Sequence, residues 1–169
     1  MKSAGWKISG CLVRILLWSA VICHAATINI NLTPPLLSGF PGSTVTFSGT
    51  LTNTTASTVF LNFAGINLSG GFTPADLDTG PFFANAPLSL AAGESTPRIG
   101  LFAIDIPNPF ADGPYQGTFT VLGGLNANAQ NTLGSANFTV QVVPEPCSVA
   151  LVGMAFVLFA YARLIMDPL

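Results

Sequence analysis

Residues 44–52 of this chain read Thr44-Val45-Thr46-Phe47-Ser48-Gly49-Thr50-Leu51-Thr52. Apolar side chains at Val45, Phe47 and Leu51 share one alternating set of positions, and hydroxyl side chains fill most of the other. Successive side chains of a β-strand point to opposite faces, so this period of two indicates one face in a core and one in water. The β-branched residues favour the same assignment. We therefore expect a half-buried strand here.

Outward from this stretch, short apolar runs recur between segments rich in Gly, Pro, Asn and Ser. They predict further strands at residues 28–32, 58–66, 88–90, 98–106, 115–122 and 135–143. The turn at 53–57 predicts that the strands on either side of it pair as a hairpin. The Gly- and Pro-rich residues 70–87 are expected to form a long irregular crossing. Seven short strands predict an all-β fold, a single immunoglobulin-like, Greek-key β-sandwich.

Two aromatic features within this predicted sandwich have more than one interpretation. Tyr115 follows the turn Gly113-Pro114 at the start of a strand, where immunoglobulin-like domains place the tyrosine of a tyrosine corner. The alternative is a tyrosine that simply packs at a strand end. Phe82 and Phe83 fall in the long irregular segment, where they could form an exposed contact, whereas most of the other phenylalanines occupy strand positions typical of a core.

The charge content argues against a nucleic-acid partner. Only 7% of all residues are charged. Between Ala26 and Val143 there are five carboxylates and one base, Arg98. Nucleic-acid binding requires clustered Lys and Arg to displace counterions from phosphates. One arginine cannot supply such a cluster, so we exclude this class.

Residues 26–143 contain neither His nor Cys. This excludes Ser-His-Asp and Cys-His catalysis, zinc sites with nitrogen or sulfur ligands, and disulfides. Asp76 and Asp78, in the run Asp76-Leu77-Asp78-Thr79-Gly80, are weak candidates for a metal site. They lack the remaining ligands of a calcium loop, so a polar turn is the favoured interpretation. We expect no cofactor, no metal and no enzymatic activity.

The N-terminal residues have the pattern of a signal peptide. Lys2, Lys7 and Arg14 precede the apolar residues 15–22, and small residues lead to a cleavage position after Ala25. An uncleaved anchor is the alternative, but the apolar core is much shorter than the roughly 20 residues that span a bilayer. We expect residues 1–25 to be removed and residues 26–143 to lie outside the cytoplasm.

The C-terminal residues combine a stiff break with an apolar run. Pro144-Glu145-Pro146 cannot lie inside a helix or a central strand, because each proline lacks a backbone donor and has a fixed φ. Almost uncharged residues follow as far as Ala162, and then Arg163. Residues 147–166 are long enough for a transmembrane helix, with Arg163 reaching the headgroups as a membrane stop.

This tail resembles the PEP-CTERM sorting signal of bacterial envelope proteins. The resemblance covers residues 144–169 and rests on Pro144, Glu145 and Pro146, the apolar run and the basic Arg163; the family usually ends in several arginines, and this chain has one there. It implies recognition and cutting by a membrane-embedded exosortase, and delivery to the cell surface or an exopolysaccharide matrix. It also implies carbohydrate attachment on Thr-, Ser- and Asn-rich surfaces, such as residues 50–58. Four Asn-x-Ser/Thr sites occur, at Asn31, Asn53, Asn67 and Asn137, but in a bacterial protein we expect no N-linked glycosylation of them.

Three functions remain open. The first is a structural exported protein of the surface or matrix, sorted through its tail and in transient contact with the inner membrane. The second is an adhesin-like domain that binds glycan through residues 76–83. The third is an outer-facing domain that stays permanently anchored because its tail is not cut.

Overall fold

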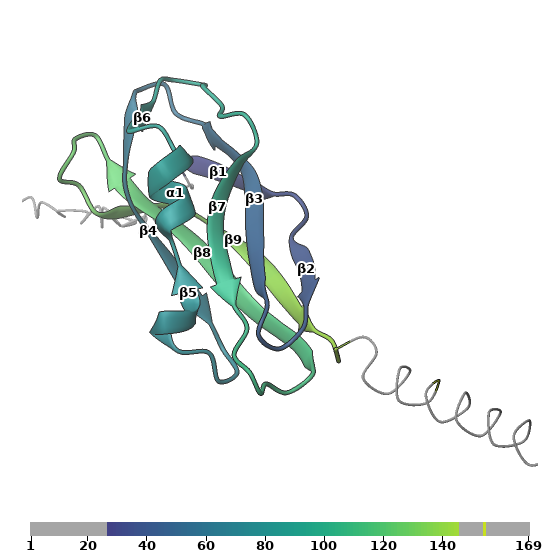
Figure 1. Cartoon of the computed structure of the whole chain (residues 1–169). Helices are drawn as coiled ribbons and strands as arrows, with labels where there is room; N and C mark the ends of the chain where they lie inside the picture. The colour runs from purple at the N-terminus through teal and green to yellow at the C-terminus, as the bar shows by residue number, and fades with distance from the viewer. Residues whose placement is uncertain (1–26, 146–153, 155–169) are drawn as a thin grey trace, which may run out of the picture.

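The computed structural model describes residues 27–145 and Met154 (Figure 1). They form two β-sheets packed face to face. In spatial order, the first sheet contains β1 (Ile28–Leu32), β3 (Thr44–Asn53), β7 (Ile99–Asp105) and β5 (Leu77–Asp78). The second contains β2 (Leu36–Gly39), β9 (Asn131–Val142), β8 (Gly113–Gly124), β4 (Val59–Leu68) and β6 (Ser89–Leu90). A 3₁₀ turn η1 (Pro74–Asp76) and one short helix α1 (Gly80–Asn85) lie between β4 and β6 in the chain.

The strand order is that of an immunoglobulin-like sandwich. Such domains place strands A, B, E and D in one sheet and G, F and C in the other. Here β1-β3-β7-β5 matches the first set, and β9-β8-β4 matches the second. The chain passes from the first sheet at β1 to the second at β2, which pairs parallel with β9. The predicted all-β, two-sheet fold is thereby confirmed.

All seven predicted strands are present, with ends that differ by a few residues. The predicted pairing of residues 44–52 with 58–66 is wrong, because β3 pairs with β1 and β7, whereas β4 pairs with β6 and β8. Residues 54–58 cross from one sheet to the other. The alternating pattern correctly predicts that both strands have a buried face. Two such faces can pack across the core from different sheets as readily as side by side in one sheet.

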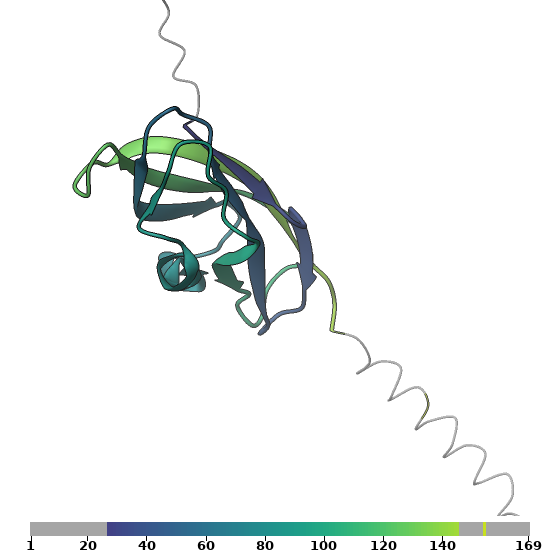
Figure 2. The same ribbon diagram turned by 90° about the horizontal axis from the view of Figure 1, so that it is seen from above.

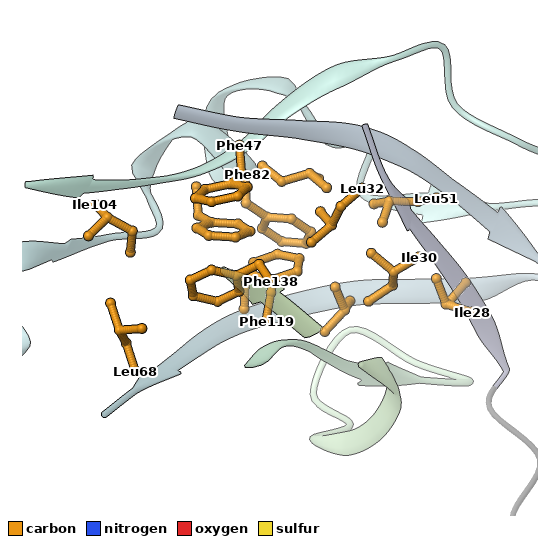
Figure 3. Close-up of a cluster of buried hydrophobic side chains, with 14 of the residues drawn as sticks. Ile28, Ile30, Leu32, Phe47, Leu51, Leu68, Phe82, Ile104, Phe119 and Phe138 are labelled. Carbon is orange, nitrogen blue, oxygen red and sulfur yellow. The ribbon is translucent and has the colours of Figure 1, made fainter. Parts of the chain in front are cut away.

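The core lies between the sheets and is built around stacked phenylalanines (Figure 3). The Phe102 ring lies 4.8 Å from Phe47 and 4.7 Å from Phe119, and both pairs are nearly parallel. Phe138 tilts against Phe102, again at 4.7 Å. These rings come from β3, β7, β8 and β9, so each sheet contributes two of them. Aromatic contacts of this kind add about 0.5–1.5 kcal/mol per pair to the effect of burial.

Helix α1 lies within the segment predicted to be irregular, so that prediction is wrong for residues 80–85. Pro81 is at the start of the helix, where its missing N–H costs nothing. The helix packs against β7 and directs Phe82 into the core, where its ring meets Phe119 of the other sheet (Figures 1 and 3). Seen from above, α1 lies on the opposite side of the sandwich from β2 (Figure 2). It therefore closes one open side of the core.

Candidate functional site

The predicted sorting motif begins directly after the last paired residue of the sandwich. Val142 is buried, and the Val143 N–H donates to the Gly39 carbonyl at 2.9 Å. The next two residues, Pro144 and Glu145, are both exposed. Proline has no N–H, so it cannot continue the pairing with β2. The chain thus leaves the sheet at the position where the motif begins, with no spacer between them.

The other residues of the export and sorting predictions lie outside the described part of the chain. These are Ala25 with the rest of residues 1–25, and Pro146, Arg163 and residues 147–166, of which the structure describes only Met154.

Within residues 27–145 and Met154, no helix is both long enough and apolar enough to cross a membrane.

The two candidate metal ligands each bind the backbone of their own turn. The Asp76 carboxylate accepts hydrogen bonds from the Thr73 N–H and hydroxyl, at 2.6 and 2.8 Å. The Asp78 carboxylate accepts from the Gly80 N–H at 2.7 Å. Among the residues that the structure describes, no three His, Cys, Asp or Glu side chains are grouped to hold a metal ion. The hydrogen bonds of Asp76 and Asp78 stabilise the turns that lead into α1.

The adjacent phenylalanines of α1 have opposite environments. Phe82 is 1% exposed and belongs to the core, so the prediction of an exposed contact is wrong for this residue. Phe83 is 54% exposed, and its ring lies 6.0 Å from that of Phe63 on β4. Consecutive residues of a helix point about 100° apart, which places the two rings in different environments. A glycan platform built on the whole segment 76–83 is therefore reduced to a single exposed ring.

Tyr115 makes the hydrogen bond that characterises a tyrosine corner. Its hydroxyl donates to the Ala111 carbonyl, four residues upstream, at 2.8 Å. The ring packs against Phe110 and Phe72, at 5.0 and 5.4 Å. A side chain at Gly70 would overlap the Tyr115 ring, so the crossing segment approaches the corner closely. Tyr115 joins the loop before β8 to the segment after β4.

A shallow groove of about 540 Å³ lies on the outer face of the five-stranded sheet. Cross-strand register places Asn67, Thr118 and Asn137 in one row across β4, β8 and β9. The next row contains Gln116, Thr139 and Leu36 on β8, β9 and β2. The Thr118 hydroxyl donates to the Asn137 side-chain oxygen at 3.1 Å. Each of these six residues contributes to the lining of the groove.

The groove has a specific chemical character. Its lining carries amide and hydroxyl groups and no ionisable side chain. An amide both donates and accepts hydrogen bonds, and so does a hydroxyl. The lining also includes the apolar residues Pro35, Leu36 and Phe138. A ligand that fits it would be uncharged and would combine apolar surface with groups that donate and accept hydrogen bonds. Alternation along the strands predicts which side chains face outward, but only the register brings residues of β2, β4, β8 and β9 into one groove.

Asn53 is a structural residue that the sequence interpretation missed. It is 1% exposed at the end of β3. Its amide nitrogen donates to the carbonyls of Ser57, Leu90 and Ala91, at 2.8–3.0 Å. Its side-chain oxygen accepts from the Thr55 N–H and hydroxyl, at 2.9 and 2.8 Å. The side chain fastens the crossover between the sheets to the start of the β6–β7 connection, which makes Asn53 unsuitable as an attachment site for sugar.

The other three Asn-x-Ser/Thr sites, at Asn31, Asn67 and Asn137, have exposed asparagines. The sequence does contain a signal that distinguishes Asn53 from these three. Asn53 lies two residues after Leu51, so the alternation of buried and exposed positions predicts that its side chain faces the core.

Comparison with known proteins provides fold-level likeness only. No family model and no curated protein matches the chain. Among solved structures, native alpha-2-macroglobulin from Escherichia coli, from domain MG7 to the C-terminus, matches with a TM-score of 0.44 and 20% identity, over 71% of this chain and 17% of that one. The ASH/PapD-like domain of human CEP192 has a TM-score of 0.42 and 14% identity, over 71% and 87%. The Vibrio cholerae VesB protease has a TM-score of 0.41 and 18% identity, over 69% and 31%. The assignment of the fold therefore rests on the strand order.

Proposed function

We propose that this chain is a non-enzymatic protein, exported across the inner membrane and sorted through its C-terminal segment to the cell surface or the extracellular matrix. One observation carries the proposal. Pro144-Glu145-Pro146 follows at once on Val143, whose N–H bonds to Gly39, and precedes an apolar run that ends at Arg163. An exosortase-type enzyme in the membrane would read this motif, and residues 147–166 would hold the chain there until it is cut.

The sandwich is suited to release because its described core is built from residues that precede the motif. Every residue of the described core lies between Ile28 and Val142. Loss of residues beyond the motif would remove none of these contacts. Burial of apolar surface, the main stabilising contribution, would stay intact. The released domain should therefore keep the fold of the attached one.

The proposal is tested by the intact mass of the protein from the membrane fraction and the medium of its native host. We expect a species that begins at Ala26 and ends near Glu145, with or without added sugar, outside the membrane. The variant with Pro144→Ala, Glu145→Ala and Pro146→Ala should keep the tail and remain in the membrane fraction. Asp112→Ala, which removes an exposed carboxylate elsewhere, is the matched control and should be processed normally. Wild-type protein that retains residues 147–169 would refute processing and indicate a permanently anchored domain.

A second candidate function is the binding of a neutral glycan in the groove of the five-stranded sheet. The uncharged amide and hydroxyl lining favours it, because sugar hydroxyls can replace the water that these groups otherwise bind. A polysaccharide of the surrounding matrix is the natural ligand of this class. The groove, rather than residues 76–83, is where we place this activity.

Retention on immobilised neutral polysaccharide, with the host's own exopolysaccharide and dextran as probes, tests the second candidate. The cross-strand pair Gln116 and Thr139 should be changed together to alanine. Their side chains form no hydrogen bond within the described residues, so the fold should persist. The matched control changes the cross-strand pair Asn31 and Thr50, on the other sheet, to alanine. Equal retention of both double variants and the wild type would argue against binding in the groove.

A further inference from the structure

One long strand of the second sheet has an open edge. β4 runs from Val59 to Leu68, but β6 pairs only with its first two residues. One further hydrogen bond joins the Leu61 N–H to the Leu88 carbonyl at 2.9 Å. Within the described residues, the rest of β4 is paired on one side only, with β8. A row of backbone groups therefore faces away from the sheet, which is a template for another strand.

This edge lacks two of the features that normally prevent pairing. Natural edge strands are usually protected by charged side chains, proline, bulges or a covering segment. Residues 59–68 contain no charged residue and no proline. The irregularity in the β4–β8 register falls between Leu61 and Phe63, so pairing is continuous from Phe63 to Leu68.

Exposed apolar side chains gather along the same edge. Phe63 is 52% exposed, Phe83 of α1 is 54% exposed, and their rings are in contact. Leu88, which precedes β6 and bonds to β4, is 83% exposed. Figure 1 shows α1, β4 and β6 on one side of the molecule. An apolar patch beside an unpaired strand edge is the signature of an association surface.

We propose that the open edge of β4 pairs antiparallel with the same edge of a second copy, and joins two five-stranded sheets into one. A two-fold axis at Gly65 would place Phe63 of each copy opposite Asn67 of the other. A Cβ at Gly65 would meet nothing within 4 Å, so its face has room for the diagonal Phe63 ring of the partner. A symmetric interface brings each edge against itself, so any charge near the axis would repel its copy. The lack of charge on β4 makes the edge compatible with a second copy.

Cysteine cross-linking of the full chain in its native host provides the test. Residues opposite each other in an antiparallel pair have Cα atoms about 4.5–5.5 Å apart, which is within reach of a disulfide. Gly65→Cys should therefore form a cross-linked dimer under mild oxidation, well above the level that native cysteines give. Thr120→Cys is the matched control, since Thr120 lies beside Gly65 on β8, one strand farther from the edge. It would lie about 14 Å from its copy and should not cross-link.

A second variant keeps the inference falsifiable if the cysteine disturbs the strand. Gly65→Lys places two like charges at the axis and should convert the dimer to a monomer in sedimentation equilibrium, with the circular dichroism spectrum unchanged. Thr120→Lys should leave the dimer intact. The inference is overturned if Gly65→Cys cross-links no more than Thr120→Cys, if Gly65→Cys cross-links only to a different protein, or if the wild type is monomeric. Each of these results is independent of whether the tail is cut.

Discussion

Replacement of Asn53 by alanine should destabilise the sandwich more than replacement of any exposed asparagine. The two N–H groups of this amide serve three carbonyl acceptors, so at least one is shared, and the side-chain oxygen accepts two further hydrogen bonds. Each hydrogen bond contributes about 0.5–1.5 kcal/mol net, and the buried Leu90 carbonyl would lose its amide donor. The free energy of unfolding should fall by about 3 kcal/mol, and Tm by about 12 °C.

Urea denaturation of the mature protein measures this change, with an unaltered slope as the sign that the two-state transition is preserved. Asn126→Ala is the matched control, because the side chain of this exposed asparagine accepts only one hydrogen bond within the described residues, from the Asn128 N–H at 3.0 Å. Asn126→Ala should lower the free energy of unfolding by less than about 1 kcal/mol. Asn53→Asp should cost more than Asn53→Ala, because it points a second oxygen at the same carbonyls. Equal stabilities of the Asn53→Ala and Asn126→Ala proteins would refute the reasoning.

Three further changes are expected to alter stability. Phe102→Ala removes the central ring of the core stack and should cost about 3–5 kcal/mol by calorimetry, as truncation of a buried phenylalanine generally does. Tyr115→Phe removes only the hydrogen bond of the corner and should cost about 1 kcal/mol in urea; a cost above about 3 kcal/mol would mean that the hydroxyl does more than bind one carbonyl. Gly123→Ala should prevent folding or severely weaken it, because its Cβ would overlap a backbone carbonyl of β4, whereas Gly65→Ala has open space and should be nearly neutral. Expression followed by circular dichroism distinguishes the two glycine variants.

The sequence predicts the long strands well because each has one buried and one solvated face. The clearest pattern, around Phe47, gives β3 correctly to within one residue at its end. The first strand, residues 28–32, is correct at both ends. Period-two alternation is a local signal, and a local signal is sufficient where one strand face meets the core.

What the sequence misses depends on contacts between distant segments. β2 has only four residues after two prolines, and its partner β9 lies about 100 residues away. Helix α1 spans six residues, too few for a 3.6-residue period to be visible. The crossover at Asn53 has the composition of a hairpin turn. Only the inward hydrogen bonds of the Asn53 side chain distinguish this crossover from a hairpin. The groove likewise depends on register, which alternation along a single strand does not specify.

The two proposals together constrain where the dimer can exist. β4 and β9 both run antiparallel to β8, so they run in the same direction, and pairing of two β4 edges reverses that direction in the second copy. Gly65 lies opposite Thr120, and Val142 lies opposite Gly113, seven residues along β8. At about 3.3 Å per residue, the two sorting motifs would leave the dimer at opposite ends, about 46 Å apart. Two uncut tails could therefore enter one membrane only if the dimer lay with its strands along the bilayer surface, whereas release of the tails would remove this constraint on pairing through β4.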